Sequence, residues 1–216
     1  MAPKLYIDFA SPPCRAVLLA AKAINVELDL VELDLLKLEH LKPEFVKLNP
    51  LHTVPTLDDN GLVLCDSHAI MGYLIDKYSN DKSLYPEEVE KRALINQRLY
   101  FDAGILFARH LGAALSVLFE GAKEVTEKQV NDLNEAYGFI ETFLQDNTYI
   151  AGNSLSIADF SILTTTTNSS VLIPIDEGKY PKISAWREKM RNLSFYDINQ
   201  FGADKFRSMI EAKLKK

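Results

Sequence analysis

The sequence has few cysteines and histidines and no excess of positive charge, and each shortage excludes a class of protein. Its 216 residues include two cysteines and four histidines, which never fall at the C-x-x-C or H-x-x-x-H spacing of a zinc site. We therefore expect no bound metal, and free thiols at Cys14 and Cys65 rather than a disulfide. The net charge of −6 lacks the Lys/Arg surplus that phosphate binding needs, so no nucleic-acid partner is expected.

Long apolar runs and phosphate-binding loops are missing as well. Apolar stretches such as residues 16–21 fall far short of the ~20 residues needed to cross a bilayer, and the N-terminus lacks a signal-type apolar core. Neither a P-loop nor a G-x-G-x-x-G pattern is present. With 47% hydrophobic and 25% charged residues, the chain is expected to be a cytoplasmic globular protein without membrane contact and without a permanently bound cofactor.

The residues up to Tyr78 carry strand and helix signals in alternation. Period-two patterns and β-forming residues predict strands, and the prolines after Ser11 and the side chains of Asp66 and Ser67 predict helix starts. The expected strands cover 4–9, 26–33, 54–57 and 62–65, and the expected helices cover 14–23 and 68–78. The element order is therefore β-α-β followed by β-β-α.

Helical periodicity dominates the rest of the chain. A Ser-x-x-Asp pattern at Ser156 and Asp159 predicts a capping box with a structural role. The expected helices cover 87–119, 127–146, 156–172, 182–192 and 203–215. The sequence thus predicts an α/β domain over residues 1–78, a polar, proline-ended linker over 79–86 and an all-α domain over 87–216.

Candidate binding residues lie at the ends of elements in the first part, where α/β sheets bind ligands. Ser11 places a hydroxyl at a positive helix terminus, which suits an anion, although the same pattern is typical of a plain helix N-cap. Asp66 suits an ammonium group and Ser67 suits a carboxylate, again with helix capping as the simpler role.

Two further features sit in connecting segments. A proline at position 55 marks an edge, a bulge or a cis bond, and a cis bond would turn the backbone of Val54 outward to pair with a bound peptide. The loop histidines His40 and His52 are suited to binding a carboxylate.

Together, the order and spacing of these residues resemble the cytosolic glutathione transferases, and within that family the insect delta and epsilon classes. The resemblance extends over essentially the whole chain. The stretches that carry it are 11–19 (Ser-Pro-Pro-Cys-Arg-Ala-Val-Leu-Leu), 39–45 (Glu-His-Leu-Lys-Pro-Glu-Phe), 49–57 (Asn-Pro-Leu-His-Thr-Val-Pro-Thr-Leu), 66–70 (Asp-Ser-His-Ala-Ile) and 157–159 (Ile-Ala-Asp). Leu51 stands where these classes often carry Gln. Asp66 stands where delta members often carry Glu, which favours an epsilon-like or unclassified placement.

The resemblance implies a thioredoxin-like N-terminal domain that binds glutathione, an all-α C-terminal domain and a homodimer. By resemblance, Ser11 would hydrogen-bond the glutathione sulfur, and Asp102 would help to orient the γ-glutamyl site. The residues implied at the rest of the glutathione site are Leu35, His40 and His52 (both at the glycine end), Thr53, Val54 (paired with the cysteinyl backbone), a cis Pro55, and Asp66 with Ser67 (at the γ-glutamyl group). Helical spacing and resemblance together place Phe107, His110, Leu111, Ala114, Leu118 and Phe206 at the pocket for the second substrate.

The implied function is glutathione S-transfer to hydrophobic electrophiles, with glutathione as co-substrate and detoxification as the role. A hydrogen bond from Ser11 and the helix terminus would favour the thiolate without a separate base. Two alternatives stay open. Cys14, at the end of a C-x-x-C-like Ser-Pro-Pro-Cys, could serve a glutaredoxin-like thiol transferase, or the chain could be a non-catalytic carrier of hydrophobic ligands.

Overall fold

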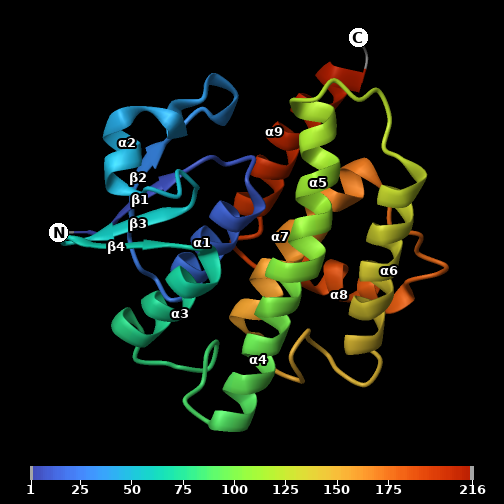
Figure 1. Cartoon of the computed structure of the whole chain (residues 1–216). Helices are drawn as coiled ribbons and strands as arrows, with labels where there is room; N and C mark the ends of the chain where they lie inside the picture. Colours follow the sequence, from blue (N-terminus) through green and yellow to red (C-terminus); the bar gives the residue numbers. More distant parts are fainter. Residues whose placement is uncertain (1, 215–216) are drawn as a thin grey trace.

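A four-stranded mixed sheet organises the N-terminal part of the structure, a computed structural model that describes residues 2–214 (Figure 1). The strand order is β2-β1-β3-β4, with β1 and β2 parallel and the other neighbouring pairs antiparallel. The strands are β1 (Lys4–Ile7), β2 (Asp29–Glu32), β3 (Thr56–Asp59) and β4 (Leu62–Cys65). The predicted β-α-β and β-β-α order is confirmed, although β2 is shorter than the expected strand over 26–33.

Three α-helices accompany the sheet, and the first begins where the prolines allow it. Helix α1 (Pro12–Ala23) carries prolines at its first two positions, where a missing N–H costs nothing. Helices α1 and α3 (Ser67–Tyr78) pack against each other. Helix α2 (Pro43–Leu48), with the 3₁₀ turns Leu35–Lys37 and Glu39–Leu41, lies between β2 and β3. The sequence pattern did not predict α2 because six residues with one buried side chain, Phe45, are too short for a periodic signal.

The C-terminal part is helical throughout, and it differs from the expected helices at two places. The single helix expected over 87–119 is interrupted by a π-helical turn at Asp102–Leu106. The last helix begins at Asp197 rather than near 203, and the expected last residue, 215, lies outside the described residues. The helices are α4 (Val89–Phe101), α5 (Phe107–Leu118), α6 (Glu127–Phe143), α7 (Ile157–Leu172), α8 (Pro181–Arg191) and α9 (Asp197–Leu214).

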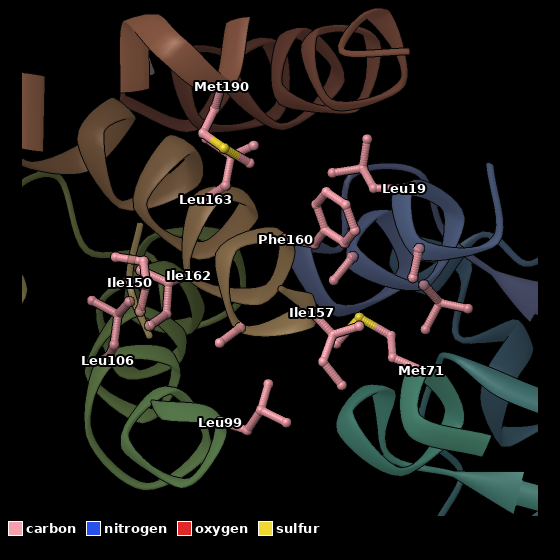
Figure 2. Packing of buried hydrophobic residues seen from close by; sticks show 14 of the residues in the cluster. Leu19, Met71, Leu99, Leu106, Ile150, Ile157, Phe160, Ile162, Leu163 and Met190 are labelled. Carbon is pink, nitrogen blue, oxygen red and sulfur yellow. The ribbon is translucent and has the colours of Figure 1, made fainter. Parts of the chain in front are cut away.

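Helix α7 is the centre of the molecule. It packs against α1, α4, α5 and α9, and Figure 2 shows Phe160 facing Leu19 of α1 while Leu163 approaches Met190 of α8. Its threonines can be buried because their hydroxyls donate to carbonyl oxygens one turn earlier, as Thr166 does to Ile162 at 2.7 Å. The two parts of the protein therefore share one continuous hydrophobic core.

The predicted capping box at the start of α7 is confirmed. The Asp159 carboxylate accepts hydrogen bonds from the backbone N–H of Ser156 (2.9 Å) and of Ile150 (2.9 Å) and from the Trp186 indole (3.0 Å). Burial raises the pKa of this carboxyl to about 6, against the lowering effect of those donors. Asp159 thus ties the loop before α7 to α8 as well as capping the helix.

Taken as one helix, Val89–Leu118 is long and apolar enough to cross a bilayer by length and composition alone. Core helices of globular proteins satisfy the same criterion, and 44% of its apolar window is buried inside the protein. Since α5 packs against α6, α7 and α9, we assign this helix to the core of the helical part.

Candidate active site

Ser11 occupies the N-cap position of α1 without capping it. Its hydroxyl accepts no hydrogen bond from the first turn of the helix and lies beside the Cys14 thiol. Its backbone is fixed on both sides, because its N–H donates to the Asp8 carbonyl at 3.0 Å and its carbonyl accepts from Arg15 N–H at 3.3 Å. A hydroxyl that does not cap the helix, at a positive helix terminus, is suited to hydrogen-bonding an anion.

A cavity of about 630 Å³ opens beside Ser11. Every residue assigned to glutathione by resemblance contributes to its wall. These residues are Ser11, Leu35, His40, His52, Thr53, Val54, Pro55, Asp66, Ser67 and Asp102. The fold thus brings segments of the sheet, the α2 region and the start of the π turn around one space.

The Val54–Pro55 peptide bond is cis, one of the three conformations expected from a proline at this position. Thr53 next to it is held by Asn49, whose side-chain amide donates to the Thr53 carbonyl at 3.1 Å and to the Thr56 hydroxyl at 2.9 Å. The loop before β3 is therefore rigidly attached to the buried side chain of Asn49, with Val54 on the cavity wall.

Asp66 has two roles at once. With φ of 73°, it turns the chain from β4 into α3, and its carboxylate caps the helix by accepting from the N–H groups of His68 (2.9 Å) and Ala69 (3.2 Å). The pKa of the carboxyl is lowered, first by its hydrogen bond with the His68 side chain. Asp66 thus presents a negative charge to the cavity at neutral pH, with Ser67 beside it.

His68 lines the same cavity, although no role was predicted for it from the sequence. Its Nε2 lies 2.8 Å from the Ser161 hydroxyl and 3.3 Å from the Asp102 carboxylate, and its Nδ1 lies 3.3 Å from the Asp66 carboxylate. Burial lowers the pKa of His68, but the bonds to Asp102 and Asp66 outweigh it and raise the pKa to about 9. A protonated imidazole therefore lies between two carboxylates of the cavity wall.

This arrangement predicts a pH dependence of stability. Because the folded pKa of about 9 exceeds the ordinary 6.5 of histidine, the stabilisation is fully present below pH 6.5 and is lost as pH rises through 9. We expect the difference in free energy of unfolding between wild type and His68→Gln to shrink by about 3 kcal/mol from pH 6 to pH 10. Urea unfolding of both proteins at a series of pH values measures it. A constant difference would contradict the protonated state of His68.

A second, smaller cavity of about 120 Å³ adjoins the first at Ser11. Ser11, Leu35, Phe107, Leu111 and Leu115 line both cavities. All side chains assigned to the electrophile pocket line this second space, namely Phe107, His110, Leu111, Ala114, Leu118 and Phe206. The sequence did not point to the further lining residues Leu36, Asn168 and Met209, since they come from three different elements.

His110 is a buried, neutral member of that wall. Its side chain is 2% exposed, and burial, with the positive charge of Arg15, lowers its pKa to about 3. Its Nδ1 has no hydrogen-bond partner among the described residues. Its neighbour Arg109 instead faces α6, where it forms an ion pair with Glu135 at 2.6 Å.

Cys14 is inaccessible as a nucleophile. It is 0% exposed, and burial raises the pKa of its thiol to about 12, so that the thiolate is absent at neutral pH. We expect Cys14→Ala to keep conjugating activity within about 3-fold of wild type, because the buried, protonated thiol is not the reacting group and alanine is a small apolar replacement. The measurement is the conjugation rate at saturating glutathione, and a loss of mixed-disulfide reductase activity in the same variant would instead support the thiol-transferase alternative.

Comparison with known proteins agrees with the two-part architecture. The family described as "Glutathione S-transferase, N-terminal domain" matches residues 5–82, and "Glutathione S-transferase, C-terminal domain" matches residues 69–194. Glutathione S-transferase 1 of Manduca sexta is 40% identical over 97% of this chain and 98% of its own.

Solved structures extend the likeness to the whole fold. An epsilon-class glutathione S-transferase from the housefly Musca domestica superposes with a TM-score of 0.95 at 43% identity, covering 98% of both chains. A glutathione transferase homolog from Drosophila mojavensis with bound glutathione gives 0.96 at 43% identity, covering 98% of this chain and 97% of its own. On this sequence, fold and cavity evidence, the chain belongs to the glutathione S-transferase family.

Proposed function

We propose that this transferase adds the glutathione thiolate, held by Ser11, to hydrophobic electrophiles bound against α5 and α9. The observation that carries the proposal is that Ser11 lines both cavities. A sulfur placed at Ser11 therefore lies next to both spaces. The family and the polar groups on the wall of the first cavity support glutathione there, and the Phe107, Leu111 and Phe206 wall supports an apolar reactant in the second.

The reaction requires only a modest lowering of the pKa of the glutathione thiol. Lowering a thiol pKa near 8.5 by about two units makes the thiolate the majority form at pH 7 and corresponds to ~2.7 kcal/mol. One hydrogen bond to the charged sulfur contributes ~1.5–3 kcal/mol and the helix terminus ~0.3–1 kcal/mol. Ser11 at the start of α1 supplies both. The thiol proton goes to solvent. The thiolate then forms the new bond to the electrophilic carbon, and the leaving group departs with the electron pair of the broken bond, as chloride does from a chlorodinitrobenzene.

The polar groups around the first cavity match the ends of the tripeptide. In this proposal, Asp66 takes the γ-glutamyl ammonium, and Ser67 with the N-terminus of α3 takes its carboxylate. The backbone of Val54 pairs with the cysteinyl unit, and His40 and His52 lie at the glycine carboxylate. Their rings are close to each other, with centroids 6.3 Å apart.

Retention on immobilised glutathione, followed by conjugation of a chlorodinitrobenzene, tests the proposal. We expect retention, elution by free glutathione and formation of the thioether. Retention without conjugation of any model electrophile would replace the enzyme by a carrier of hydrophobic ligands. Failure to bind glutathione would remove the proposal altogether.

The remaining expectations concern the setting of the enzyme. We propose a cytoplasmic homodimer that detoxifies electrophiles, with domains over residues 1–78 and 87–216 joined by 79–86. The 72% exposed Tyr100 of α4 and the exposed Leu62 of edge strand β4 offer apolar surface to a second copy. A bidentate ion pair between Arg92 and Asp76 (3.0 and 3.2 Å) bridges the linker. Sedimentation equilibrium decides between monomer and dimer.

A further inference from the structure

Arg15 is a buried cation without a counter-ion. Its side chain is 0% exposed, and burial lowers its pKa to about 10, so it stays protonated at neutral pH. Its guanidinium makes five hydrogen bonds, all to neutral oxygens, and among residues 2–214 it has no carboxylate within ion-pair distance. An unpaired buried charge is costly, which suggests that the positive charge itself is used.

The guanidinium fixes the backbone that leads to Ser11. Nη1 donates to the carbonyl oxygens of Phe9 and Ala10, each at 2.9 Å. The Ala10 oxygen also accepts from the Asn168 amide at 2.9 Å. Both carbonyls therefore point into the core, and the cation-bound oxygen of Ala10 belongs to the peptide bond that joins Ala10 to Ser11.

The positive charge of Arg15 also lies close to the cavity proposed for the electrophile. Nη2 donates to the Asn168 side-chain oxygen at 2.6 Å, and Asn168 lines that cavity. On the same wall, the charge of Arg15 adds to the effect of burial in holding His110 neutral. A group in this cavity is thus separated from the guanidinium by a single amide, in surroundings that screen charge poorly.

We propose that Arg15 is a positioning residue for the glutathione thiolate, which holds the Phe9 and Ala10 carbonyls behind Ser11 and stabilises the anionic sulfur through its uncompensated charge. The inference rests on the proposed function, because it assumes that the sulfur sits at Ser11. In general, two unit charges about 8–10 Å apart at an effective dielectric constant near 20–40 attract by an amount worth about one pH unit of thiol ionisation.

Asn199→Asp tests the charge without removing the arginine. The Asn199 side-chain oxygen accepts from Arg15 Nε at 3.0 Å, and its amide donates to the Thr167 hydroxyl at 3.1 Å. Aspartate keeps the shape and the bond to Nε, and the Thr167 hydroxyl can rotate from the Leu163 carbonyl to donate to the new oxygen. The new carboxylate therefore balances the positive charge of the guanidinium, while the contacts of Arg15 with Phe9 and Ala10 stay in place.

The ionisable groups that face the sulfur site or act on Arg15 are unchanged in this variant. The carboxylates are Asp8, Asp66 and Asp102, and the imidazoles are His40, His52, His68 and His110. The thiols are Cys14 and Cys65, and Tyr196 acts on Arg15 from the segment before α9. A difference in thiol titration between variant and wild type therefore reports on the charge of Arg15.

The readout is the ultraviolet titration of the bound glutathione thiolate, together with the pH profile of kcat/KM. We expect Asn199→Asp to raise the pH of half-ionisation by about one unit and to lower kcat/KM at pH 6.5 about 10-fold, with full activity regained at high pH. The neutral control Asn199→Ser should leave the thiol titration where it is in wild type. An unchanged titration in Asn199→Asp, or an equal shift in both variants, overturns the proposal.

A second pair of variants decides the question if Asn199→Asp does not fold. Arg15→Lys keeps the charge and loses the forked contacts, whereas Arg15→Gln loses both. We expect the thiol titration of Arg15→Lys to stay near wild type and that of Arg15→Gln to move upward, and equal titrations overturn the proposal. Retention on immobilised glutathione is measured in parallel, because loss of binding in wild type would defeat the proposed function rather than the role of Arg15.

Discussion

Ser11→Ala is expected to lower kcat/KM for conjugation at neutral pH by about 30-fold. The substitution removes a hydrogen bond to a charged sulfur, worth ~2 kcal/mol, and each 1.4 kcal/mol is a factor of ten. Because the Ser11 hydroxyl makes no cap hydrogen bond to α1, its loss should cost little stability. The pH of half-ionisation of bound glutathione should rise by about 1.5 units.

The control for this prediction is Ser11→Thr, which keeps a hydroxyl at this position. It should recover most of the wild-type profile, whereas the alanine variant should approach wild-type rates only at high pH. Steady-state kinetics across pH 5.5–9.5 measures both. If the alanine variant gave the wild-type pH profile, Ser11 would have no part in ionising the thiol.

Gly202→Ala is expected to be strongly destabilising and to reduce conjugation. A Cβ at this position of α9 would lie 2.1 Å from the Phe9 carbonyl oxygen and 2.3 Å from Arg15 Cδ. The first of these is backbone, which cannot yield without moving the segment before Ser11. We expect a loss of about 3 kcal/mol in the free energy of unfolding, at the upper end for overpacked sites.

A matched control exists on α6. Gly138 is also helical, and a Cβ there would meet nothing within 4 Å. Gly138→Ala should therefore raise stability by up to about 1 kcal/mol through helix propensity alone. Urea unfolding and conjugation rates of both variants separate the two effects. Equal stability of the two variants would show that α9 can move away from Phe9 without cost.

Most elements of the fold could be predicted from local sequence signals. Prolines after Ser11 start α1, and the Ser156 and Asp159 pair starts α7, because capping depends on neighbours within one turn. The π turn at Asp102–Leu106 has no such signal, since its residues are compatible with an uninterrupted helix. Helix ends and interruptions were therefore the parts that required tertiary structure.

The candidate site likewise has a part that could be predicted from the sequence and a part that could not. The cavity-lining side chains could be predicted from residue order and family resemblance. The same reasoning predicted no role for His68, whose partner Ser161 is 93 positions away. The contacts of Arg15 with Asn168 and Asn199 span 153 and 184 positions. No periodicity or spacing within one segment encodes such pairs, because they depend on how α7 and α9 pack on α1.

The π turn at Asp102–Leu106 determines which side chains of α5 line the cavity proposed for the electrophile. A π turn contains one residue more than the α turn it replaces, and each residue of an α-helix advances the chain by roughly 100° around its axis. Deleting a single residue from Asp102–Leu106 would therefore swing Phe107, Leu111 and Leu115 away from the sulfur site together. One codon lost or gained here would therefore exchange a whole face of the cavity in a single step.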